Sequence, residues 1–216
     1  MKLSSSGFRR FFNSYYECLI DIGPIGCNYQ PGHSHADTFT FDLHAKGVPF
    51  IVNHGITTYE KNNQRQLERS TPAHNTVSLD QNNSSIVWGG FRVAQRANVE
   101  VKLAIENQII AQHDGYKRFG IIHQRNWTFE PDYINIEDEI IGYNEVGIAH
   151  FWLARDLIPV KDNNRIITNI GYFHFEGSKS MDIINKEVPY GFNKFTKCYK
   201  LEIKFQNKLT SKIYIN

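Results

Sequence analysis

The sequence predicts an all-β domain, most simply two packed antiparallel sheets (a β-sandwich) with few or no helices. Apolar and polar residues alternate over short stretches, which places the apolar side chains on one face of each strand. Turn-forming residues interrupt these stretches at roughly every tenth position, as expected for successive short strands. No segment shows a long apolar stripe at helical spacing.

The first alternating stretch is 38–43, in which Phe39, Phe41 and Leu43 alternate with polar residues. Similar stretches follow, and we expect a strand in each of 50–53, 98–103, 134–136, 166–175, 199–205 and 210–215. Turn signals separate them, among them Pro31-Gly32, Asn62-Asn63, Asp114-Gly115 and Glu176-Gly177.

Length and composition bound the class of protein. The 216 residues, with 24 basic and 22 acidic side chains, fit one domain over residues 1–216. Cys18, Cys27 and Cys198 form no C-x-x-C pair and indicate no compartment. No apolar run is long enough to span a membrane, no secretory signal precedes the domain, and the basic residues form no cluster suited to nucleic acid.

The segment richest in chemistry is 31–37, where His33, His35 and Asp37 stand at alternate positions before the first strand. In an extended backbone these side chains share one face, and the same parity continues into Phe39 and Phe41. Polar groups at the edge of a core need partners, so we expect them to bond to one another or to bind a metal.

Further histidines follow at His54 and His74, each beside a predicted strand. Zinc takes imidazole nitrogen and carboxylate oxygen, with three protein ligands in an open site. The spacing alone also fits an ordinary hydrogen-bonded histidine pair, and both interpretations stand at this point.

The order and spacing of several motifs resemble the C-terminal β-sandwich domain of the heparinase II/III-like polysaccharide lyases. The resemblance is strongest from Ser5 to Arg125, and Glu137-Asp138 also matches. The segments that carry it are 21–26, Pro31-Gly32-His33-Ser34-His35-Ala36-Asp37, 47–53, 55–59, Arg65, Arg69-Ser70-Thr71-Pro72-Ala73-His74-Asn75-Thr76-Val77 and His123-Gln124-Arg125.

This resemblance implies a role for each matching residue. His33 is the catalytic histidine that faces the sugar, and His35 and His74 are zinc ligands. The third ligand of the family is an aspartate, and Asn53 stands in its place. Since a neutral amide is a poorer zinc ligand, we expect weak or absent zinc, with Asp37 either compensating or orienting His35.

The resemblance also implies which substrates the family cleaves and that this chain lacks the helical toroid of the family. Family members cleave uronic-acid glycans such as heparan sulfate, other glycosaminoglycans and alginate by β-elimination, with an N-terminal helical toroid that forms the cleft. No toroid is present in this chain, so a separate helical chain is the expected partner. We expect Arg65 and Arg69 to pair with substrate carboxylates, the alternative being that they lie on a solvated loop.

Three functions remain for the sequence. The chain is the β-domain of a lyase that is inactive alone, or a non-catalytic remnant that binds an acidic glycan through exposed aromatic residues, or an independent zinc hydrolase, which Asn53 disfavours. The candidate aromatic residues are Tyr29, Tyr59, Trp88 and Trp127, although such residues lie in a core more often than at a sugar-binding surface. Family habit predicts a bacterial periplasm or cell envelope as the location.

Overall fold

The computed structural model describes residues 6–27, 29–142 and 146–216, and it confirms the all-β prediction. The described residues contain one short α-helix, α1 (Asn63–Glu68), and two 3-10 turns, η1 (Thr71–Ala73) and η2 (Lys117–Phe119). Everything else that is regular is antiparallel strand. No helix among these residues has the length and apolar character needed to cross a membrane.

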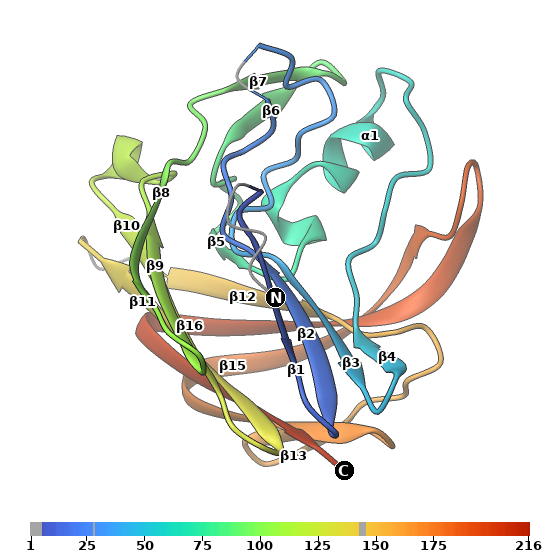
Figure 1. The fold of residues 1–216 in the computed structure, drawn as a ribbon. Helices are drawn as coiled ribbons and strands as arrows, with labels where there is room; N and C mark the ends of the chain where they lie inside the picture. Colours follow the sequence, from blue (N-terminus) through green and yellow to red (C-terminus); the bar gives the residue numbers. More distant parts are fainter. Residues whose placement is uncertain (1–5, 28, 143–145) are drawn as a thin grey trace.

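The smaller sheet holds four strands in chain order: β1 (Phe8–Phe12), β2 (Tyr16–Asp21), β3 (Phe41–Ala45) and β4 (Val48–Ile51). The alternation read from the sequence is visible here, because every second residue of β2 and β3 is buried. These buried faces lie against the larger sheet (Figure 1).

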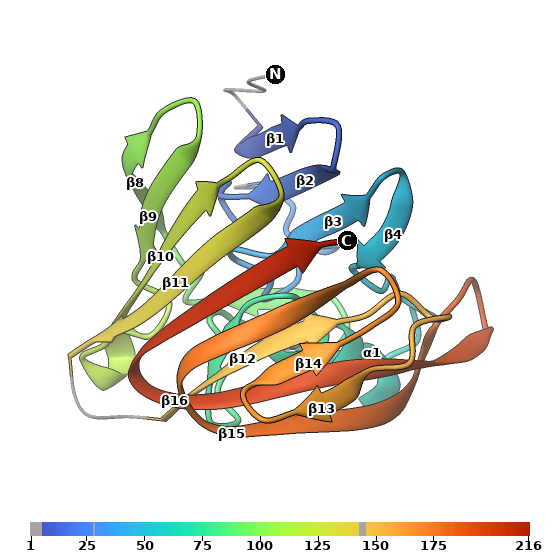
Figure 2. The same ribbon diagram turned by 90° about the horizontal axis from the view of Figure 1, so that it is seen from below.

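The larger sheet has the strand order β13-β14-β15-β16-β11-β10-β9-β8, and β12 joins β16 to β5. It curves so that β8–β11 and β13–β16 flank the smaller sheet (Figure 2). Its strands are β5 (Val77–Leu79), β8 (Val99–Ala104), β9 (Gln108–His113), β10 (Ile122–Phe129), β11 (Tyr133–Ile141), β12 (Val146–Trp152), β13 (Val160–Asp162), β14 (Arg165–Ile167), β15 (Gly171–Pro189) and β16 (Phe195–Ile215). A separate hairpin consists of β6 (Ile86–Trp88) and β7 (Arg92–Ala94).

Two of the predicted strands form one long strand, and one predicted strand is split. Stretches 199–205 and 210–215 both belong to β16, which pairs with β15 along nearly its whole length. The pairing shifts register near Gly177, whose φ of +85° allows the backbone to bulge there. Stretch 166–175 instead divides between β14 and β15 around the turn at 168–171.

The core between the sheets is aromatic. The rings of Phe41 and Phe151 lie 6.2 Å apart, and those of Phe50 and Phe173 lie 5.3 Å apart. Trp127 is fully buried at the other end, edge-on to Phe39. This apolar packing fixes the position of the loops that leave the sheets above it, where the histidines lie.

Candidate metal centre and its surroundings

The segment that carries His33, His35 and Asp37 consists of two successive turns, so the predicted extended backbone is wrong. The amide of Ser34 donates to the carbonyl of Pro31 at 3.0 Å, and that of Thr40 donates to Asp37 at 2.9 Å. Strand β3 therefore begins only at Phe41. Proline followed by glycine favours the first turn and aspartate at the first position favours the second, which ends the alternation.

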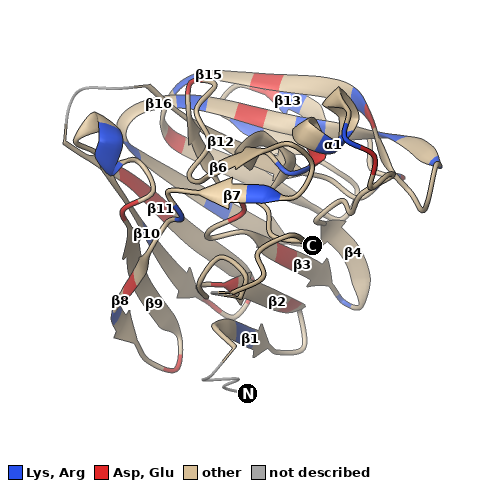
Figure 3. Cartoon of the chain, turned by 90° about the horizontal axis from the view of Figure 1, so that it is seen from above, with Lys and Arg blue, Asp and Glu red and all other residues tan. Residues whose placement is uncertain are grey.

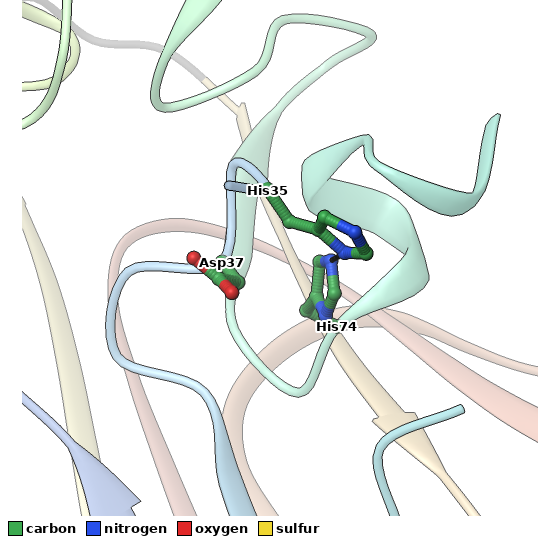
Figure 4. Close-up of side chains that lie close together, drawn as sticks. All are labelled: His35, Asp37 and His74. Atoms are coloured by element: carbon green, nitrogen blue, oxygen red, sulfur yellow. Dashed lines mark hydrogen bonds between the residues drawn. The ribbon is translucent and has the colours of Figure 1, made fainter. Parts of the chain in front are cut away.

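His35 and His74 meet nonetheless, as predicted. His35 Nδ1 lies 3.2 Å from His74 Nε2, and the ring centres are 5.2 Å apart (Figure 4). His74 follows η1, whose Pro72 suits the first positions of such a turn. Two nitrogen ligands of one tetrahedral zinc ion lie about 3.3 Å apart, so this separation suits a shared cation.

Asn53 lies on the opposite side of the His74 ring from His35. Its Oδ1 is 2.9 Å from His74 Nδ1, and its Nδ2 donates to Thr40 Oγ1 at 2.7 Å. The amide oxygen therefore accepts the Nδ1 proton of His74, which leaves Nε2 with its lone pair directed toward His35. In this arrangement Asn53 orients a histidine and does not face the space between the two rings.

Asp37 lies beside the two imidazole rings (Figure 4). One oxygen of Asp37 and one nitrogen each of His35 and His74 all lie within 4.8 Å of one another (Figure 4). Burial, with the nearby carboxylate of Asp21, raises the pKa of Asp37 to about 7. The His35–Asp37–His74 group is a possible metal-binding triad with one anionic ligand. This grouping favours the expectation that Asp37 compensates as a ligand, whereas Asn53 contacts His74 from its Nδ1 side, and the roles of both stay predictions.

Both histidines of the triad are neutral at neutral pH. Burial, together with Arg65, Arg69 and His33, lowers the pKa of His35 to about 4. Burial and the neighbouring His35 also lower the pKa of His74. Neutral imidazole is the form that binds a metal ion, so the environment favours ligation over protonation.

Arg65 and Arg69 lie beneath the surface at the end of α1, so the solvated-loop alternative is wrong. Both side chains are fully buried, and neither forms an ion pair within the described part of the chain. Arg65 Nε donates to the carbonyl of Gly90 at 3.3 Å, and Arg69 Nε donates to that of Ser34 at 3.0 Å. Arg65 Nη1 and Nη2 and Arg69 Nη1 have no hydrogen-bond partner among the described residues. Two buried cations therefore lie close enough to His35 to lower its pKa, and the carboxylate of Glu68 offsets the charge of Arg65 only in part.

His33 is exposed at the surface above these arginines. Its ring contacts the edges of Tyr59 and Phe91 at 5.6 and 6.4 Å between centres. The guanidinium carbon of Arg65 lies 5.3 and 5.7 Å from the same two rings. His33 also borders a surface pocket of about 320 Å³, shared with Asp21, His35 and Asp37. Phe91 could not be predicted as part of the site from the sequence, because an aromatic residue at a hairpin turn carries no signal of its own.

Of the aromatic residues considered for sugar binding, three are exposed and one is buried. Tyr29, Tyr59 and Trp88 are 88%, 48% and 40% exposed, so they are available at the surface. Trp127 is wholly buried, so for this residue the core alternative holds, and its ring fills the core against Phe39. Seen from above, acidic and basic residues are spread over many elements of the chain, with basic positions on α1 and β7 (Figure 3).

The family is decided by the sequence itself. The family described as "Heparinase II/III-like, C-terminal" matches residues 2–214, nearly the whole chain. This chain belongs to the heparinase II/III-like C-terminal family. The comparison with curated proteins gives no match.

Solved structures of heparinases have the same fold as this heparinase II/III-like domain. The heparan sulfate lyase HepC from Pedobacter heparinus aligns with a TM-score of 0.79 at 22% identity. A heparinase III aligns with a TM-score of 0.78 at 16% identity. The domain is covered to 99% and 100% in these alignments but spans only 36% and 37% of the two solved chains. It corresponds to the C-terminal third of heparinases.

Proposed function

We propose that this chain is the C-terminal domain of a polysaccharide lyase that cleaves uronic-acid glycans by β-elimination and that it is inactive alone. The observation that carries the proposal is the exposed imidazole of His33, two residues from His35 of the partly buried His35–His74 pair, in a heparinase II/III-like domain. The same arrangement would let one loop hold both the metal centre and a group that faces substrate.

The chemistry assigns His33 a limited part. In β-elimination a base removes the proton at C5 of the uronate, a C4–C5 double bond forms, and the C4–O bond breaks while the leaving oxygen gains a proton. The carboxylate beside C5 must also be neutralised, so that charge developing in the transition state is stabilised. His33 is placed to exchange a proton with a sugar at the surface, while the remaining groups would come from a helical partner.

The charge near His33 supports an acidic substrate. Arg65 and Arg69 are buried, neither forms an ion pair among the described residues, and Glu68 is the one carboxylate that offsets Arg65, so we infer a positive potential at the surface above them. We propose that a uronate or sulfate group of a glycosaminoglycan is attracted there. Because Tyr59 and Phe91 lie beside Arg65, direct contact with its guanidinium requires these rings to move.

We propose zinc as the metal, held by His35, His74 and Asp37. Two neutral imidazoles and one carboxylate are a donor set that zinc accepts, and Asn53 would fix the orientation of His74 from behind. A bound zinc ion would supply positive charge and hold the loop of His33 in place. The expected periplasmic or cell-envelope location is a prediction that rests on the family resemblance.

A second candidate, glycan binding without cleavage, is favoured by the exposed rings of Tyr59 and Phe91 beside His33. The two rings are nearly parallel, at 8°. Flat aromatic rings at a surface suit the apolar faces of sugars, and the buried arginines suit an acidic one. Binding without turnover by the complete protein would support this candidate over the first.

One experiment separates these functions. The chain alone, and the chain together with a helical heparinase domain, are mixed with heparan sulfate, alginate and polyglucuronate, and ultraviolet absorbance reports the unsaturated product. We expect no turnover by the chain alone, because positioning in a cleft supplies roughly 7 to 11 kcal/mol of such a barrier. Turnover by the chain alone that is lost in His33→Ala would refute the claim of inactivity, and the Ser34→Ala variant of the neighbouring residue serves as the matched control.

A further inference from the structure

A buried ion pair lies directly under the two loops that carry the histidines. Arg125 on β10 and Asp138 on β11 face each other in the strand register, and both are fully buried. Arg125 Nε lies 2.6 Å from Asp138 Oδ1, and Nη2 lies 3.0 Å from Oδ2, so the contact is bidentate. Both carboxylate oxygens of Asp138 therefore accept a hydrogen bond from Arg125.

The remaining guanidinium nitrogen of Arg125 reaches both histidine loops at once. Its Nη1 donates to the carbonyl of Phe39 at 2.9 Å and to that of Asn75 at 3.0 Å. Phe39 lies on the turn that follows His35 and Asp37, and Asn75 is the neighbour of His74. A single planar group thus fixes the separation of two segments that are distant in sequence.

The backbone at Phe39 needs such support. Its φ is +71°, a left-handed conformation that is unfavourable for a residue with a bulky side chain. Besides the bond from Arg125, the Phe39 ring packs against His113, His123 and Trp127 at 4.9 to 5.5 Å between ring centres. Strained residues that the surroundings hold in place are common at functional sites.

Two buried histidines, His113 and His123, complete this hydrogen-bond network. His123 Nε2 lies 2.7 Å from Asp138 Oδ1, and His113 Nε2 lies 3.0 Å from His123 Nδ1. Both carboxylate oxygens of Asp138 are therefore hydrogen-bonded, Oδ1 to His123 and Arg125 and Oδ2 to Arg125. A buried ion pair is often no more stabilising than apolar residues of the same size, which leaves geometric specification as its distinct contribution.

We propose that Arg125, held by Asp138, is the positioning residue that sets the spacing and relative orientation of His35 and His74. The metal-binding consequence of this proposal rests on the proposed function, whereas the spacing itself does not. Arg125 acts through the carbonyls of Phe39 and Asn75 and touches neither imidazole.

The first test needs no metal and uses the full chain with ¹⁵N-labelled histidine. In the wild type, His74 should carry its proton on Nδ1, facing Asn53, and His35 should carry its proton on Nδ1, facing His74 Nε2. Long-range ¹H–¹⁵N spectra of the imidazole rings report both protons. The two Nδ1–H resonances therefore report whether His35 and His74 keep the spacing and orientation seen in the structure.

The variant is Arg125→Met/Asp138→Leu, which removes the ion pair without leaving one buried charge alone. The control is Ile136→Val, a fully buried residue two positions from Asp138 on β11. Urea unfolding selects conditions in which all three proteins are folded. We expect the control to keep the wild-type histidine spectrum and the double variant to lose the defined Nδ1–H pattern of His35 and His74. A folded double variant with the wild-type pattern would overturn the proposal.

A zinc titration of the same proteins gives the second readout. We expect about a 10- to 100-fold loss of zinc affinity in the double variant, the size found when groups that orient ligands are changed. Unchanged affinity in the double variant would overturn the proposal. If the wild type takes up no zinc, the proposed metal site fails, and the imidazole spectra still decide on Arg125.

Arg125→Lys tests the proposal if the double variant does not fold. Lysine keeps the charge opposite Asp138 but offers one nitrogen, which cannot serve both carboxylate oxygens and both carbonyls. We expect this variant to be folded, with the Nδ1–H resonances of His35 and His74 broadened or doubled. A single wild-type set of resonances would refute the need for the planar guanidinium.

Discussion

The buried histidines make the domain sensitive to acid, and His113 allows this to be tested at one residue. His113 is 1% exposed, and its Nδ1 accepts the amide proton of Gly115 at 3.1 Å. Burial, with His123 and Arg125 nearby, lowers the pKa of His113 well below its ordinary value. A proton on Nδ1 would place two N–H groups against each other, so the folded state holds the neutral ring.

The sign of the effect follows from linkage. The pKa of His113 is lower when folded than when unfolded, so its contribution to the free energy of unfolding is present above about pH 6.5 and is lost as the pH falls. A histidine that stays neutral when folded loses about 2 kcal/mol of stability between pH 7 and pH 5. That is a large fraction of the roughly 5 to 15 kcal/mol typical of whole domains.

The wild type alone does not isolate this quantity, because Asp37 acts in the opposite direction. The pKa of Asp37 is raised to about 7, so its carboxyl group gains a proton in the folded state over the same range and stabilises the fold as the pH falls. The difference between wild type and His113→Gln cancels the contribution of Asp37. It therefore reports His113 together with any change at His123, whose Nδ1 lies 3.0 Å from His113 Nε2.

The assay is urea unfolding of both proteins in chelator at pH 7 and pH 5. We expect His113→Gln to be less stable at pH 7, because glutamine cannot reproduce both ring hydrogen bonds. Its further loss on going to pH 5 should be smaller than that of the wild type by about 2 kcal/mol. Between pH 7 and pH 8 the two curves should run parallel. Equal losses between pH 7 and pH 5 would refute the neutral, buried state of His113.

Two more predictions concern the metal centre and the core. Asn53→Asp should raise zinc affinity by about tenfold or more, since a carboxylate behind His74 makes Nε2 a stronger ligand; equilibrium dialysis measures it, and unchanged affinity would contradict the orienting role of this position. Trp127→Ala should cost about 3 to 5 kcal/mol of unfolding free energy, because a fully buried ring would leave a cavity beside Phe39; a smaller loss in urea unfolding would show that the core collapses around it.

The strands were predictable from the sequence, and the loop conformation was not. Alternation identified β8, β11 and both halves of β16, because the period of side chains in a strand is two wherever one face is buried. It failed at Phe39, which continues the alternating pattern but has a positive φ. Phenylalanine carries no local preference for that conformation, and the contacts that impose it come from Arg125 and the aromatic core.

The sequence predicted which residues belong to the candidate metal centre better than it predicted how they are arranged. His35 and His74 meet as expected, although they are 39 positions apart, because the family resemblance supplied a long-range relation that spacing alone does not. The resemblance put Asn53 in a ligand position, and it left Asp37 open as a compensating ligand or as a group that orients His35. Their positions depend on which side of the His74 ring each loop approaches, and only the folded backbone determines that.

The Asn53 substitution has a different meaning once this arrangement is known. If position 53 were a ligand, an amide there would remove the only anion from the metal centre and weaken zinc strongly. Since Asn53 Oδ1 accepts from His74 Nδ1, the amide still fixes the proton of that ring on the correct nitrogen. The anion can come from Asp37, which lies within 4.8 Å of both imidazoles. The substitution therefore reduces the basicity of one ligand and leaves the donor set complete, so the zinc affinity of the unmodified chain should be lowered and not abolished.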